Sequence, residues 1–204
     1  FEHPATPRQL SLDGLAHYLT LNWTPAPYTL AAGIEKLAPG TWLDWRDGVI
    51  RQGRYWTLDF APESRYTLES AKEELDALLK DSLREHLLSD VPLGIWASGG
   101  IDSSAVLHYA AQQYPGKLKT FSVSFRGRSF DESPYFQEIA RHYSTEHHEF
   151  DLNPDVDLRD AIEGLPYFSD EPSADAGALP VWFLSKMSRR HVTVALSGEG
   201  ADEL

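Results

Sequence analysis

An apolar run that ends in two glycines and continues as a helical pattern constrains this chain more than any other feature. Residues 93–97, Leu-Gly-Ile-Trp-Ala, are typical of a short buried strand. Gly99 and Gly100 interrupt the run, and from Ser103 to Tyr114 the apolar residues recur at helical spacing. The pattern predicts a strand, a glycine turn and the start of a helix.

A junction of this kind favours a bound anion. Glycines let backbone N–H groups approach a ligand, and the unpaired N–H groups and positive dipole end of the following helix attract phosphate. The hydroxyls of Ser98, Ser103 and Ser104 add donors. Asp102 would repel a phosphate unless a magnesium ion lay between them, so we predict that Asp102 is a magnesium ligand. Neither the Walker A nor the Rossmann glycine pattern is present in this stretch.

A second glycine-bearing loop, residues 197–203, follows an apolar strand pattern at residues 192–196. It places three carboxylates within five residues, those of Glu199, Asp202 and Glu203. Crowded carboxylates beside a phosphate are costly unless a metal offsets their charge. We therefore predict that Asp202 is a second magnesium ligand facing Asp102. The alternative is an acidic turn without a ligand.

Taken together, the two loops resemble those of the asparagine synthetase family. Residues 98–104 read Ser-Gly-Gly-Ile-Asp-Ser-Ser, like the pyrophosphate-binding loop of the ATP pyrophosphatase group, and residues 197–203 read Ser-Gly-Glu-Gly-Ala-Asp-Glu. The resemblance implies that Glu199 assists formation of an acyl-adenylate, and that Asp102 and Asp202 hold Mg²⁺. The residues that it implies for binding of ATP and pyrophosphate are Ala97, Ser98, Gly99, Gly100, Asp102, Ser103, Ser104, Val123, Ser197 and Gly198.

Adenine recognition is expected at strand ends, because extended backbone offers the N–H and C=O pair that the edge of adenine requires. In relatives of this family the base lies where Ala97 and Val123 fall in this sequence. The alternative for Val123 is a core valine.

Strands and helices alternate through residues 67–204. Strand patterns at residues 119–125, 147–150 and 192–196 alternate with helix patterns, one from Asp131 to Tyr143 with Asp131 as its cap and one at residues 181–190. Thr67 is expected to cap a long helix at residues 68–88, with its leucines forming one packed stripe. The alternation predicts an α/β fold with a doubly wound parallel sheet, in which ligands bind beyond the carboxyl ends of the strands. The resemblance implies the adenine nucleotide α-hydrolase-like form of that fold.

Residues 1–60 differ in character from the rest. Ser11 is expected to cap a short helix, and residues 41–51 predict a hairpin around Asp47-Gly48. Four of the six tryptophans lie in this section, which is too small to bury them alone: Trp23, Trp42, Trp45 and Trp56. The resemblance implies the C-terminal remnant of a glutaminase domain and a linker, with residues 67–204 as the synthetase domain. A small self-contained appendage is the alternative.

Charge and composition exclude several classes of partner. The net charge of −13 argues against nucleic acids and anionic membranes, and no apolar run reaches membrane-spanning length. The chain has no cysteine, so it has no disulfide and no thiol nucleophile for glutamine hydrolysis. These features fit a cytoplasmic protein.

His142, His147 and His148 do not predict a zinc site, because adjacent strand residues point to opposite faces.

The resemblance implies ATP-dependent amide formation. ATP would adenylate aspartate with release of pyrophosphate, and ammonia from a glutaminase domain would attack the acyl-adenylate. A related amidotransferase, or a β-lactam or macrolactam synthetase acting on another carboxylic acid, stays open, as does a non-catalytic nucleotide-binding module. Residues 169–175 lie in a region that is near the carboxylic substrate in the family, yet they contain no arginine to bind its carboxylate. Family members continue past Asp-Glu-Leu to a catalytic lysine, so we expect a fragment; a homodimer is left open.

Overall fold

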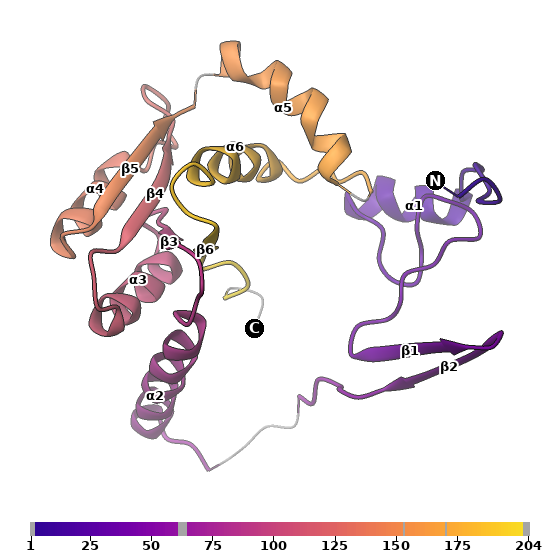
Figure 1. The fold of residues 1–204 in the computed structure, drawn as a ribbon, viewed down its shortest axis with the longest axis horizontal. Coiled ribbons are helices and arrows are strands. Elements are labelled where there is room, and N and C mark those ends of the chain that lie inside the picture. The colour runs from indigo at the N-terminus through magenta and orange to yellow at the C-terminus, as the bar shows by residue number, and fades with distance from the viewer. Residues whose placement is uncertain (1–2, 61–64, 153, 170, 202–204) are drawn as a thin grey trace. The chain divides into compact units, whose positions relative to one another are not determined.

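The computed structural model describes residues 3–60, 65–152, 154–169 and 171–201 (Figure 1). Its contacts divide the chain into two compact units. Unit 1 comprises Phe1–Ser64 and Pro166–Ala176, and unit 2 comprises Arg65–Leu165 and Gly177–Leu204. A short segment from the middle of the second unit's sequence therefore belongs to the first unit, an excursion that no sequence pattern indicated.

Unit 2 contains a sheet of four parallel strands in the order β5-β4-β3-β6. The chain runs from β3 (Leu93–Trp96) to β4 (Lys119–Ser124) and β5 (Glu146–Asp151), then returns to place β6 (Val194–Leu196) on the other side of β3. The strand order therefore reverses between β3 and β6, which makes this position a topological switch point. Ligands of open α/β sheets bind at such a point. The parallel sheet confirms the sequence prediction.

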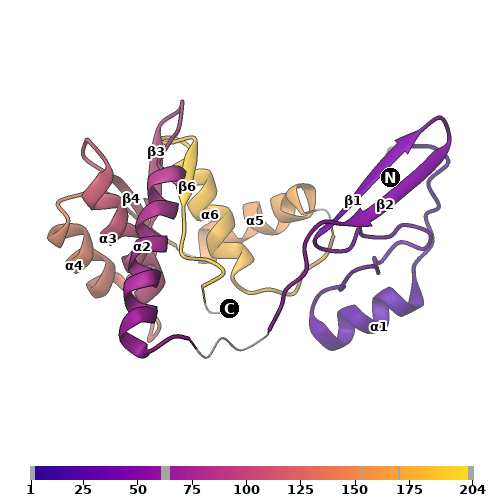
Figure 2. The same ribbon diagram turned by 90° about the horizontal axis from the view of Figure 1, so that it is seen from below.

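Helices cover both faces of this sheet (Figure 2). On the Ile95 face, α2 (Leu68–His86), α3 (Ile101–Gln113) and α4 (Ser133–His142) enclose a core. The opposite face carries Val123, which packs with α5 (Pro154–Phe168) and α6 (Ala178–Ser188). Successive strand residues alternate between faces, so two separate cores form. The sheet is therefore doubly wound, as predicted.

Helix α2 begins as its sequence indicates but packs over less of its length. Thr67 Oγ1 accepts a hydrogen bond from Ser70 N at 3.2 Å and Ser70 Oγ accepts one from Thr67 N at 2.9 Å, which completes a capping box. Leu83 is buried, whereas Leu75 and Leu78 are 56% and 61% exposed. The prediction of one packed leucine stripe is therefore wrong for these two residues, because the described part of unit 2 covers only the later turns of the helix.

Asp131 is not the N-cap of α4, contrary to the sequence prediction, because Glu132 occupies that position. The Asp131 carboxylate instead accepts hydrogen bonds from Ser133 Oγ at 2.5 Å, Ser133 N at 3.2 Å and Phe125 N at 3.2 Å. The bond from the Ser133 hydroxyl is the main reason why the pKa of Asp131 is lowered. Asp131 thus closes the loop between β4 and α4.

Helix α5 was not expected from the sequence, and its late turn contains Pro166.

The elements of unit 1 agree more closely with the sequence predictions. Ser11 Oγ accepts from Gly14 N at 3.1 Å and caps α1 (Leu12–Leu21), while β1 (Thr41–Arg46) and β2 (Val49–Arg54) form the predicted antiparallel hairpin. The hairpin turns at Asp47 and Gly48, which have φ of 49° and 81°. The four tryptophans of this unit are 45% to 65% exposed.

Candidate nucleotide site

The site is built at the carboxyl ends of β3 and β6. The turn after β3 leads into α3, whose N-cap is Gly100 and carries no side-chain cap. The first turn of this helix closes with the bond from Ser104 N to Gly100 O at 3.1 Å. The N–H groups of Ile101, Asp102 and Ser103 precede that bond, so the helix itself does not use them. They form a ready anion-binding site at the positive end of the helix dipole.

Serine hydroxyls hold the turn in shape. Ser103 Oγ is buried, accepts a hydrogen bond from Ser98 N at 3.2 Å and lies 2.9 Å from Ser98 Oγ. Ser98 Oγ in turn accepts from Gly100 N at 3.2 Å. Ser104 Oγ donates to Gly100 O at 2.5 Å. The sequence suggested these hydroxyls as donors to a ligand, and the structure shows that they also organise the loop.

Two glycines permit backbone contacts that no other residue would allow. At Gly99, where φ is +87°, a Cβ would lie 2.7 Å from Tyr135 Cβ and 2.8 Å from Phe136 N. At Gly198 a Cβ would lie 2.7 Å from Ser103 N. The second loop therefore lies directly against the first turn of α3, and the two motifs that the sequence singled out meet in space.

A cavity of 320 Å³ opens where the loops meet. The predicted residues that line it are Ala97, Ser98, Gly100, Asp102, Ser103, Val123, Ser197, Gly198 and Glu199. Gly99 and Ser104 are not among its lining residues. The structure thus gathers most of the predicted site around one space.

One wall of the cavity was missed by the sequence analysis. It is apolar, and its residues come from β3, β4, the loop after β4 and α6: Trp96, Phe121, Phe125, Pro180, Val181 and Leu184. Glu132, at the start of α4, also lines the cavity. The helical spacing of Pro180, Val181 and Leu184 was the available signal, but such spacing predicts a packed face equally well.

The part of Ala97 in adenine recognition stays a prediction, and Ala97 lines the cavity. Its N–H donates to Phe121 O at 2.9 Å, and its C=O accepts a hydrogen bond from the side-chain hydroxyl of Ser122, so both groups have partners within the protein. An adenine edge therefore does not find a free N–H at Ala97. Val123, on the neighbouring strand β4, also lines the cavity, and its part in adenine recognition likewise stays a prediction.

Two acidic residues of the predicted chemistry line the cavity, Asp102 and Glu199. Asp202 lies outside the described residues, so its pairing with Asp102 stays a prediction. Within residues 3–60, 65–152, 154–169 and 171–201, no three His, Asp or Glu side chains are grouped to hold a metal ion. The fit of Mg²⁺ rests on Asp102, since a carboxylate oxygen is the donor that this ion prefers.

The two adjacent histidines of β5, His147 and His148, point to opposite faces of the sheet. His147 packs on Phe136 of α4, and its Nδ1 lies 2.9 Å from Thr120 Oγ1. Burial lowers the pKa of His147. His148 stacks on Phe121, with the two rings 12° from parallel. The two rings therefore have different surroundings, as strand alternation predicts.

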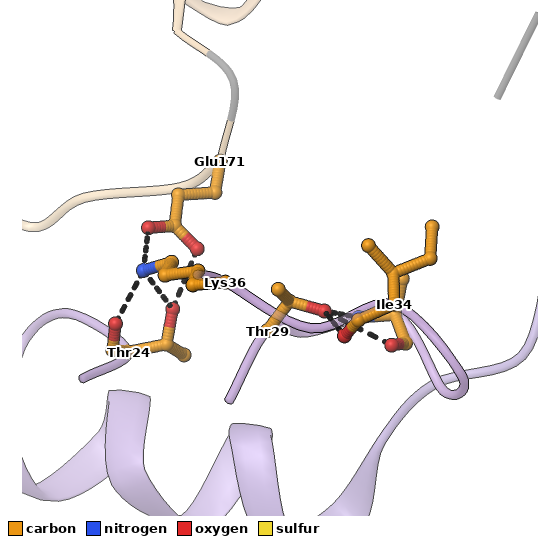
Figure 3. Close-up of polar contacts among 6 residues, drawn as sticks. Thr24, Thr29, Ile34, Lys36 and Glu171 are labelled. Carbon is orange, nitrogen blue, oxygen red and sulfur yellow. Dashed lines mark hydrogen bonds and ion pairs between the residues drawn. The ribbon is translucent and has the colours of Figure 1, made fainter. Parts of the chain in front are cut away.

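The loop at residues 169–175 belongs to unit 1. Asp170 lies outside the described residues. The Glu171 carboxylate accepts hydrogen bonds from Lys36 Nζ and Thr24 Oγ1, so it is engaged within the unit (Figure 3). The expected role of this loop as a wall for a carboxylic substrate stays a prediction.

The asparagine synthase family model matches residues 74–204, a range that contains both loops. The chain belongs to the asparagine synthase family. It is 38% identical over 197 residues to asparagine synthetase [glutamine-hydrolyzing] 1 of Bacillus subtilis, an alignment that covers 96% of this chain and 31% of that protein. It is 34% identical over 199 residues to putative asparagine synthetase [glutamine-hydrolyzing] 2 of Methanocaldococcus jannaschii, covering 96% of this chain and 38% of that protein.

This family member therefore spans 31% and 38% of the length of those two relatives. Among solved structures, the NH3-dependent NAD synthetase from Campylobacter jejuni aligns with a TM-score of 0.45 and 11% identity, over 64% of this chain and 58% of that one. Within the part of the chain that the structure describes, every helix is too short or too polar to cross a membrane.

Proposed function

We propose that this chain carries the nucleotide site of an ATP-dependent amide-forming ligase of the asparagine synthetase type. ATP would adenylate a carboxylic acid, pyrophosphate would leave, and ammonia would attack the acyl-adenylate. The observation that carries the proposal is the close contact of Gly198 with the start of α3, which joins both loops around one cavity. Residues 67–204 would form the synthetase domain and residues 1–60 the end of a glutaminase domain.

The turn after β3 suits a departing pyrophosphate. The free N–H groups of the first turn of α3 are fixed by the helix and by the Ser98–Ser103 hydrogen bonds, so they need no rearrangement as negative charge builds up. Gly198 lets the second loop approach the start of α3, where a side chain at this position would meet Ser103 N. The apolar wall formed by Trp96 and Val181 provides a surface on which a flat base can lie.

Asp102 would hold Mg²⁺ at the phosphate end, with Asp202 as the second ligand. The bound ion would neutralise phosphate charge during adenylation. Glu199 lines the same cavity and would assist the adenylation step. Because the chain carries a net charge of −13, local backbone dipoles and the cation must supply the attraction for ATP.

Aspartate is the acceptor that the family resemblance favours. One observation supports a second candidate, namely another carboxylic acid. The charged side chains among the described lining residues of the cavity are all carboxylates, those of Asp102, Glu132 and Glu199. None of these groups would pair with the second carboxylate of aspartate.

Calorimetric titration of this chain with ATP and with pyrophosphate, each with and without magnesium, tests the proposal. We expect magnesium-dependent binding of both ligands, and failure of the folded chain to bind either would refute the site. Exchange of labelled pyrophosphate into ATP then tests the chemistry, because it requires cleavage between the α and β phosphates. Exchange with aspartate supports the first candidate, exchange with a different acid supports the second, and binding without exchange identifies a non-catalytic module.

A further inference from the structure

The hydroxyl of Ser188, on α6, joins two residues that line the nucleotide cavity. It donates a hydrogen bond to Leu184 O at 2.6 Å, and its oxygen accepts one from Trp96 Nε1 at 3.3 Å. Leu184 and Trp96 both line the cavity, whereas Ser188 is 3% exposed and is not among the described lining residues. All three residues belong to unit 2. A buried hydroxyl outside the cavity therefore connects one wall residue on β3 with another on α6.

The direction of these hydrogen bonds follows from the groups that make them. The Ser188 hydroxyl has a single proton, and its acceptors are carbonyls of its own helix, Leu184 O at 2.6 Å and Ser185 O at 3.4 Å. The indole nitrogen of Trp96 can only donate, so it uses the lone pair that Ser188 has left. A tryptophan side chain has two rotatable bonds, and a hydrogen bond at one edge of its ring restricts both of them.

The neighbours of Trp96 on the sheet are a second aromatic residue and a glycine. Trp96 pairs in register with Phe121 of β4, and Phe121 also lines the cavity. Gly94 lies on the same face of β3 as Trp96, because strand residues alternate. A Cβ at Gly94 would lie 2.5 Å from Phe121 Cε2, so the Phe121 ring occupies the space beside this glycine. Trp96 and Phe121 therefore bring two adjacent aromatic residues to one face of the sheet.

The wall that these residues share with α6 suits the base of a nucleotide. Val181 and Leu184 of α6 add aliphatic side chains to the two aromatic residues of the sheet. Ligand cavities hold flat apolar groups between such side chains, and nucleobases stack on aromatic rings. The unpaired N–H groups that suit phosphates belong to the start of α3. The cavity therefore offers different chemistry to the two ends of a nucleotide.

We propose that Trp96 is the residue on which the base of ATP stacks and that Ser188 is its positioning residue, which holds the indole ring in the orientation that receives the base. The inference rests on the proposed function, because it assigns one part of that nucleotide to this wall. It concerns the base alone, so ligands that consist only of phosphates should be indifferent to both residues.

Calorimetry with two ligands, each in the presence of magnesium, tests the inference. One ligand is ATP, and the other is inorganic tripolyphosphate, which has three phosphates and no nucleoside. Trp96→Ala should raise the dissociation constant for ATP about 10-fold, the size of one base stacked on a ring. Ser188→Ala should raise it about 5-fold, within the range of one lost hydrogen bond. The dissociation constant for tripolyphosphate should not change, whereas a variant that misfolds would lose both ligands.

A double-mutant cycle separates positioning from a general effect on the fold. Trp96→Phe keeps an aromatic ring but removes the N–H that Ser188 accepts. In that background Ser188→Ala should leave the ATP affinity unchanged, because the hydrogen bond is already gone. An equal loss of affinity in both backgrounds would overturn the positioning role. Ser185→Ala is the control, since it changes an exposed serine of the same helix and should keep the wild-type affinity.

The indole proton of Trp96 gives a readout that needs no ligand. Its signal in nitrogen-15 NMR spectra is the one that disappears in Trp96→Phe. Exchange of this proton with water should become about 5-fold faster in Ser188→Ala and should not change in Ser185→Ala. An unchanged rate in Ser188→Ala would show that the hydroxyl does not hold the ring.

The wild-type chain separates failure of the inference from failure of the proposed function. Equal affinity for ATP and tripolyphosphate would overturn the inference, because the base would contribute nothing, and the phosphate site would stand. Binding of neither ligand would refute the proposed function, and the assignment of the base would fall with it. Weaker ATP binding in Trp96→Ala, with an unchanged tripolyphosphate affinity, would support the base contact.

Discussion

The backbone of Gly198 packs closely against the amide nitrogen of Ser103. A Cβ at position 198 would lie 2.7 Å from Ser103 N, 2.8 Å from Asp102 C and 3.0 Å from Asp102 Cβ. Two of these neighbours, Ser103 N and Asp102 C, are backbone atoms at the start of α3. Unlike the end of a flexible side chain, they cannot move aside to make room for a Cβ. The contact fixes the distance between the second loop and the anion-binding end of the helix.

The first prediction concerns this contact. Gly198→Ala should weaken magnesium-dependent pyrophosphate binding about 10-fold or more, because overpacking of this kind costs about 1–3 kcal/mol and about 1.4 kcal/mol corresponds to a factor of ten. Gly116→Ala is the control, since its Cβ would meet Tyr114 at an ordinary 3.5 Å. Calorimetry measures both variants, and a wild-type affinity in Gly198→Ala would show that the loops do not form the site together.

The second prediction concerns the cation. Asp102 lines the cavity beside the first turn of α3, so Asp102→Asn should remove most of the magnesium dependence of ATP binding. The ratio of ATP affinities with and without magnesium should fall towards unity. Asp81→Asn changes an exposed carboxylate on α2 that pairs with Arg84, and it should preserve the wild-type ratio. A full magnesium effect in Asp102→Asn would remove this residue from the metal site.

The third prediction concerns the buried hydroxyl of Ser103. Ser103→Ala leaves the Ser98 N–H without its acceptor, and loss of such a partner costs about 1–3 kcal/mol. We expect the free energy of unfolding in urea to fall by about that amount and pyrophosphate affinity to fall with it. The exposed Ser82→Ala substitution on α2 provides the comparison. Equal stability of the two variants would show that the Ser98–Ser103 bond does not support the loop.

The fourth prediction concerns pH. Partial burial raises the pKa of Glu171, but the hydrogen bonds from Lys36 and Thr24 outweigh it and lower the pKa from its ordinary value of 4.5. A carboxyl with a lowered folded-state pKa stabilises the fold above its unfolded pKa and loses that contribution as pH falls through the folded value. The difference in melting temperature between wild type and Glu171→Gln should therefore be constant near neutral pH and shrink below pH 4.5. A difference that persists unchanged in acid would contradict this assignment.

Local signals predicted several elements well. The N-cap at Thr67, the Asp47-Gly48 turn and the glycine turn before α3 all appear where the sequence indicated them. Each of these features depends on dihedral preferences and hydrogen bonds within a few residues. Asp131 shows the limit of such reasoning, because Glu132 is the N-cap of α4, and the Asp131 carboxylate joins Ser133 N at the helix start to Phe125 N across the loop.

The sequence by itself determined the chemistry of the first loop, because glycine conformations and the N–H groups of a helix start are local properties of residues 98–104. Only the tertiary structure decided what surrounds that loop. Gly198 lies against Ser103 because β6 is placed beside β3. Leu184 belongs to the apolar wall of the cavity because α6 packs beside the sheet. The tie between Lys36 and Glu171 joins residues 135 positions apart. Such contacts depend on strand order and on where the chain returns, which no short pattern encodes.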